Sequence, residues 1–147
     1  MRQMLIVVLA ALAALAVFGC ASDRNVPLPY SIADSMALPE YKDRLKDVAF
    51  YFGNQPHPAI AKTIRAVTTA QRSNAAGSTT KDAPCARAFV SALLRLQSAA
   101  LKEGGNAVID IKSNYKHNEV SSETQFQCAT GVLMSGVALK GTIVKLK

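Results

Sequence analysis

The sequence has few of the residues that build catalytic or metal centres. Its 147 residues include three cysteines and two histidines, with no CxxC pair and no histidine cluster. A zinc site needs several such ligands at close spacing. The GxSxG pattern of a nucleophile elbow and the HExxH pattern of a zinc peptidase helix are also absent. We therefore expect no catalytic residue, no metal and no cofactor, and we predict that the protein is not an enzyme.

Long apolar runs are scarce too. The run Leu5–Phe18 has 14 residues, whereas a membrane-spanning helix needs roughly 20. Arg2 precedes this run and the small residue Gly19 follows it. A charged start, a short apolar stretch and a small residue at the cleavage site are typical of a secretory signal peptide. We assign residues 1–19 to such a leader.

Cys20 follows the leader directly, as the lipid-bearing cysteine of a bacterial lipoprotein does. We predict lipidation of Cys20 and a tether over residues 20–29, rich in polar residues and proline. Ala21 rather than aspartate comes next, which favours the outer membrane. Because Phe18 is bulkier than usual for this motif, cleavage near Ala16 or Ala21 is the alternative. It would leave a soluble periplasmic protein.

The remaining two cysteines are Cys85 and Cys128. An oxidising periplasm favours a disulfide between them. The alternative is a metal site that His57 or His117 completes. The predicted helix around Cys85 and the predicted strand around Cys128 both direct their cysteine to the apolar side, so we predict the disulfide.

Acidic residues are fewer than basic ones. Seventeen Lys and Arg against ten Asp and Glu give a net charge of +7. The basic residues are spread over the chain without a dense block, which indicates a solvated surface rather than a nucleic-acid site. An exported protein also rarely meets DNA, so we expect no nucleic-acid partner.

After the tether, residues 30–147 are long enough for a single domain with its own core. Residues 39–45 favour one or two helical turns. The clearest element is a long helix over residues 82–103, which Asp82 can cap, with Pro84 in its first turn and Gly104-Gly105 at its end. Alternating or β-branched residues predict strands at Asp47–Gly53, Ile60–Gln71, Asn106–Ser113, Glu123–Val132 and Gly136–Leu146. A helical stripe leaves Ile60–Gln71 ambiguous, and we choose strand.

Two strands carry specific expectations about their faces. In Asn106–Ser113, Ala107, Ile109 and Ile111 are predicted to point inward. In Gly136–Leu146, Gly141 indicates a bulge or a close backbone approach. Strict alternation places Val137, Leu139 and Ile143 inward, whereas a bulge brings in Val144 and Leu146, and both alternatives stay open.

The other polar candidates are isolated. His57 lies between two prolines in a predicted exposed turn, and His117 lies with Glu119 and Glu123 in a polar hairpin. Asp110 is a single carboxylate on a strand, which we expect to be solvated or ion-paired.

Three segments carry a family resemblance, namely Lys102–Gly105 at the helix end, Asn106–Ile111 (NAVIDI) and Gly136–Thr142 (GVALKGT). Through them the chain resembles the YbjQ/RcsF-like domains of small exported bacterial proteins. This implies an α+β fold in which one long helix packs on a mainly antiparallel sheet. Sequences of this kind are sometimes labelled excinuclease ATPase subunits. The phosphate-binding pattern GxxxxGK[ST] is absent, which argues against an ATPase.

The predicted function is that of an outer-membrane lipoprotein. The lipid on Cys20 would hold it, and the domain would face the periplasm and bind another envelope component in a sensor or assembly role. The alternative is a soluble periplasmic module for a small ligand or a metal, which a homo-oligomer would suit. A hydrolase with a site that the sequence does not reveal is a third hypothesis.

Overall fold

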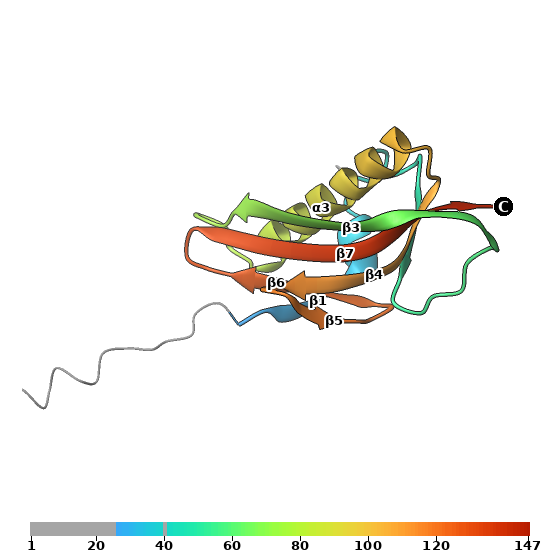
Figure 1. Cartoon of the computed structure of the whole chain (residues 1–147). Coiled ribbons are helices and arrows are strands. Elements are labelled where there is room, and N and C mark those ends of the chain that lie inside the picture. Colours follow the sequence, from blue (N-terminus) through green and yellow to red (C-terminus); the bar gives the residue numbers. More distant parts are fainter. Residues whose placement is uncertain (1–25, 40) are drawn as a thin grey trace, which may run out of the picture.

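A computed structural model describes residues 26–39 and 41–147, and Figure 1 shows their arrangement. The prediction of an α+β protein with a mainly antiparallel sheet is confirmed. Cys20 and the predicted leader lie outside the described residues. The elements in chain order are β1 (Leu28–Ser31), α2 (Ile32–Met36), β2 (Ala49–Phe52), β3 (Ile60–Asn74), α3 (Asp82–Lys102), β4 (Ala107–Tyr115), β5 (Asn118–Val120), β6 (Gln125–Thr130) and β7 (Met134–Leu146).

The long strand β7 organises the sheet. It pairs with β3 along one side and with β4 and β6 along the other, always antiparallel. Beyond these, β1 pairs with β6, β5 with β4, and β2 with β4 in parallel. In the part of the chain that the structure describes, β3 alone lies on the far side of β7, which makes it a margin of the sheet.

Helix α3 covers one face of the sheet and closes the main core. Its apolar stripe buries Phe89, whose ring stacks on Phe126 of β6 with a centroid distance of 4.0 Å. The helix ends at Gly104, where φ is +76°. A glycine adopts this conformation without steric cost, and the Gly105 N–H then donates to the Ala100 carbonyl at 2.8 Å.

Strand β4 contains a bulge that the sequence did not predict. Between Ile109 and Lys112 its register shifts by one residue, and Asp110 there has φ +50°. The bulge exchanges the two faces of the strand. Ala107 and Ile109 belong to a small second cluster, whereas Ile111 lies in the main core. The predicted common face of these three residues is therefore wrong.

Strand β7 follows the strict alternation, because the extra residues at its register shifts lie on β3 and β4 and not on β7. Three of its residues lie in the main core and two in the second cluster, namely Val137, Leu139 and Ile143 against Val144 and Leu146. Gly141 marks a close approach to β4, because a Cβ at this position would lie 2.9 Å from Cγ1 of Val108.

The N-terminal segment differs from the prediction. Strand β1 begins at Leu28, so the last residues of the predicted tether belong to the sheet. The helix that follows is α2, where the Ser31 hydroxyl accepts from the Asp34 N–H at 3.2 Å as a side-chain cap. The described residues of the segment 39–45 form isolated hydrogen-bonded turns and no regular helix, with the Lys42 N–H donating to the Leu38 carbonyl at 3.2 Å and the Arg44 N–H to the Tyr41 carbonyl at 2.9 Å.

Candidate binding site at the edge of strand β3

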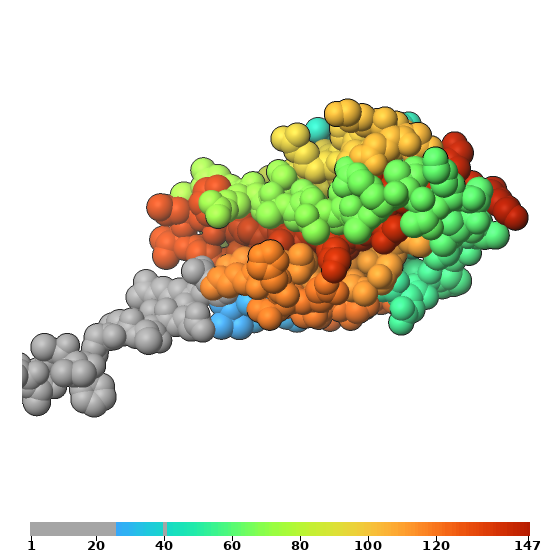
Figure 2. Space-filling view, in the orientation of Figure 1, coloured from blue at the N-terminus to red at the C-terminus, as the bar shows by residue number. Residues whose placement is uncertain are grey.

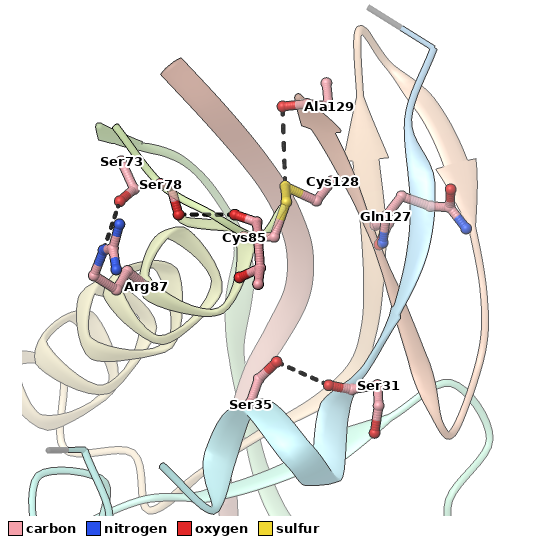
Figure 3. The surroundings of a disulfide bond; sticks show 11 residues. Ser31, Ser35, Ser73, Ser78, Cys85, Arg87, Gln127, Cys128 and Ala129 are labelled. Atoms are coloured by element: carbon pink, nitrogen blue, oxygen red, sulfur yellow. Dashed lines mark hydrogen bonds between the residues drawn. A yellow bond between two sulfur atoms is a disulfide. The ribbon is translucent and has the colours of Figure 1, made fainter. Parts of the chain in front are cut away.

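The predicted disulfide is confirmed. Cys85 at the start of α3 is bonded to Cys128 of β6, with a Cα–Cα distance of 5.9 Å, and both residues are fully buried (Figure 3). Bonded sulfur atoms cannot serve as thiolate ligands. The bond ties the helix to the sheet and is structural rather than a reactive centre.

The two histidines lie in exposed turns and not beside the buried Cys85–Cys128 disulfide. His57 lies in the turn between β2 and β3, exposed, with Nδ1 2.8 Å from the Pro58 carbonyl oxygen and its ring 5.5 Å from that of Tyr51. His117 lies at the exposed tip of the β4–β5 hairpin, where φ is +64°. These places agree with an exposed turn and a hairpin tip.

The carboxylates are engaged by lysines. Asp110 pairs with Lys112 at 3.0 Å, as expected of an ion-paired residue. Glu119 accepts a hydrogen bond from Lys140, which lowers the pKa of this carboxyl. Within residues 26–39 and 41–147, no three His, Cys, Asp or Glu side chains lie close enough together to hold a metal ion.

The exposed margin of the sheet is the most distinctive binding feature. Strand β3 has 15 residues, and among the described residues it pairs only with β7. The other marginal strands β1, β2 and β5 have four residues or fewer. Natural sheets keep edge strands short or guard them, because an open edge pairs readily with another chain.

At each end of this margin an arginine side chain donates a hydrogen bond to a backbone carbonyl of β3. Arg65 donates from Nη1 to the Ala66 carbonyl at 3.0 Å, and Arg87 donates from Nη2 to the Asn74 carbonyl at 3.1 Å. Between them lie residues 67–73, which we call the β3 edge. Their pairing with β7 is regular, so every second residue directs its N–H and C=O away from the sheet. In the described part of the chain these outward groups have no backbone partner.

A hollow of about 430 Å³ lies beside the β3 edge, between β3 and α3. From the strand it is lined by Val67, Thr69 and Gln71, and from the helix by Arg95 and Ala99. The helix therefore leaves space next to the strand. Side chains of an added strand would enter this space on the helix side.

The opposite, helix-free face is also accessible along β3. There Thr68 and Ala70 are exposed, and with Ala138 of β7 and His117 they line a shallow hollow of about 350 Å³. Figure 2 looks onto this side, where the green band of β3 runs below the yellow of α3 and the red of β7 shows beneath it. The β3 edge is thus open on both of its faces.

Positive charge dominates the surroundings of the edge. Glu103 is engaged by Arg65, with Nε 2.9 Å from both carboxylate oxygens, and this pairing lowers the pKa of Glu103. Arg72 on the open face and Arg95 on the helix side are exposed. Neither has an ion pair or side-chain hydrogen bond with the residues that the structure describes. The two free guanidinium groups can bind carboxylates of a partner.

Comparison with known protein families, with curated proteins and with solved structures finds no match for this chain. No helix in the described ranges is long and apolar enough to cross a membrane. The resemblance to YbjQ/RcsF-like domains stays a prediction, and the function is argued from the geometry of the β3 edge.

Proposed function

We propose that the protein is an outer-membrane lipoprotein of YbjQ/RcsF-like type, anchored through Cys20. Its periplasmic domain binds an extended, acidic segment of another envelope protein along the β3 edge and performs no catalysis. The unpaired backbone of residues 67–73, with the free guanidinium groups of Arg72 and Arg95 on its two faces, carries this proposal. Cys20 after an apolar leader supports the address.

Strand addition fits the dimensions of the site. Seven residues of strand extend over about 23 Å, so the partner contributes a strand of about seven residues. Its backbone pairs with β3, which gives affinity, and its alternate side chains give specificity. One set enters the hollow beside Thr69 and Gln71, and the other lies on the open face beside Thr68 and Ala70.

Charge selects the partner. Strand β3 contains Lys62, Arg65 and Arg72 and no acidic residue. Like charges on adjacent strands are destabilising and opposite charges are stabilising, so a second copy of β3 is a poor partner. An acidic strand meets Arg95 on one face and Arg72 on the other.

Photo-crosslinking in intact cells tests the proposal. A benzoylphenylalanine at Thr68 or Ala70 should capture a protein, whereas the same group at exposed Asn118 of β5 should not. The double variant Arg72→Glu and Arg95→Glu should abolish capture. The double variant Lys145→Glu and Lys147→Glu makes the same charge change at exposed residues near the C-terminus and should preserve capture. Equal capture at all three crosslinker positions, or capture that survives the double variant, contradicts binding at the β3 edge.

Cell fractionation tests the anchor separately. The wild-type protein should sediment with outer membranes and incorporate labelled palmitate. Cys20→Ala should incorporate none and appear in the soluble periplasmic fraction. A Cys20→Ala protein that still sediments with outer membranes refutes the anchor and leaves the binding edge untouched.

A specific observation favours small-ligand binding as the second candidate. A hollow of about 500 Å³ lies next to the start of α3, lined among others by Lys81, Pro84 and Ser135. The Ser135 hydroxyl is buried without a hydrogen-bond partner among the described residues, and such groups usually have one. Native mass spectrometry should then detect a bound molecule that Ser135→Ala releases. A wild-type mass equal to that of the bare chain counts against it.

A further inference from the structure

The turn between β6 and β7 displays three apolar side chains to solvent. Val132, Leu133 and Met134 are 77%, 66% and 45% exposed. Single exposed apolar residues are ordinary, but a contiguous apolar group on a protruding turn marks an interaction site. We call these three residues the apolar tip.

The apolar tip has a fixed backbone. Gly131 donates its N–H to the Met134 carbonyl at 2.8 Å and closes the turn. Ala75, directly after β3, donates to the Leu133 carbonyl at 2.8 Å. The side chains are therefore presented without a further loss of backbone freedom on binding, which favours insertion into an apolar medium.

The position of the tip matches the start of the described chain. Because β1 is antiparallel to β6, with Leu28 opposite Cys128, the start of β1 lies beside the end of β6. The tip follows that end directly. Cys20 lies six residues before Val26, and six residues span at most about 20 Å. In Figure 1 the β6–β7 turn is at the end of the domain opposite the C-terminus.

Two basic residues lie near the tip. Lys81 lines the same hollow as Val132, and Arg87 binds the carbonyl of Asn74, which pairs with Met134. The connection between β3 and α3 contains no acidic residue before Asp82. Exposed apolar residues with basic residues beside them suit the headgroup region of an anionic membrane.

We propose that the apolar tip inserts into the anionic phospholipid surface beneath the anchored domain. This inference rests on the proposed anchoring through Cys20. Insertion at a second point fixes the orientation that a lipid tether alone leaves free. Strand β3 ends beside the tip, so the β3 edge then extends away from the membrane towards a partner.

Fluorescence on tethered protein tests the insertion. In the mature chain, a hexahistidine segment replaces Cys20 together with its lipid and binds chelating lipid in phosphatidylethanolamine vesicles with a minority of phosphatidylglycerol. An environment-sensitive dye is attached to Val132→Cys, or to Lys147→Cys as the control. Since Cys85 and Cys128 are bonded and buried, each protein has one reactive thiol.

We expect a blue shift and quenching by brominated lipid at residue 132 and neither at residue 147. Leu133→Ser should lower the ratio of inserted to free dye roughly tenfold. Equal spectra at both positions, with or without a shift, overturn the proposal. A shift at residue 132 that needs added envelope protein rather than vesicles also overturns it. The chelating tether replaces the acyl chains, so none of these outcomes depends on lipidation of Cys20.

Discussion

Removal of the Cys85–Cys128 disulfide should lower the free energy of unfolding by about 4 kcal/mol. The bond closes a loop with a sequence separation of 43 residues. In the chain-entropy model a loop of that length restricts the unfolded chain by about 13 cal/mol/K, which is about 4 kcal/mol at 25 °C. For a domain of this size that corresponds to a melting temperature lower by about 15 °C.

Urea unfolding of the oxidised and the reduced wild-type protein measures this effect without a change of side chain. The variant Cys85→Ala and Cys128→Ala should unfold near the reduced protein. Its midpoint should be slightly lower, because both cysteines are fully buried and each substitution removes a sulfur atom from the core. The dependence of the free energy on urea should also steepen, since the unlinked chain expands further on unfolding.

A loss below about 1 kcal/mol on reduction would refute this reasoning. It would mean that residual contacts in the unfolded chain already hold the segments around Cys85 and Cys128 close together. The covalent link would then restrict the unfolded chain very little. The single variant Cys85→Ala checks the result independently of the reducing agent, because it removes the link and leaves one thiol in place. It should unfold near the reduced wild-type protein.

Three further predictions concern stability and are checked by chemical denaturation. Asp110→Gly should raise the free energy of unfolding by about 0.5 kcal/mol and Asp110→Val should lower it by about 1–2 kcal/mol, because φ is +50° there; the reverse order would refute the assigned bulge. Gly141→Ala should lower it by about 1–3 kcal/mol through overpacking, since the new Cβ would lie 2.9 Å from Val108 Cγ1; an unchanged midpoint would contradict this contact. Because Arg65 lowers the folded pKa of Glu103, the stability that this pair gives should be present above the unfolded pKa of about 4.3 and be lost as the pH falls through the folded value. Glu103→Gln should flatten that acid limb, and an unchanged limb would exclude the pair as its cause.

Local signals were sufficient for helix α3. Pro84 suits a first helical turn, and Gly104 supplies the left-handed conformation that ends the helix. Both effects act within one turn of chain, and hence the sequence places the boundaries within one residue. The inward direction of Cys85 also follows from local geometry, because a residue four positions before Phe89 lies on the same face of the helix.

The β-bulge in β4 was beyond sequence reasoning. An alternating strand and a strand with one extra residue differ only in how they pair with a neighbour. Asp110 points outward in a regular strand and in a bulged strand alike, so the residues around it do not indicate which of the two forms. The partner strand β7 decides the register, and the inner faces of Ala107 and Ile111 follow from it.

The candidate site divides in the same way. The composition of β3, rich in β-branched and basic residues and free of acidic ones, is a property of the sequence and is the basis on which we propose an acidic partner. Whether that strand is central or marginal depends on pairing between segments far apart in the chain. The sequence by itself also predicted the helix and the inward faces of the two cysteines, and the proposed anchoring through Cys20 rests on the sequence alone. Only the tertiary structure decided that the far side of β3 has no strand partner among residues 26–39 and 41–147 and that Val132–Met134 protrude, because edges and tips are defined by what other segments leave uncovered.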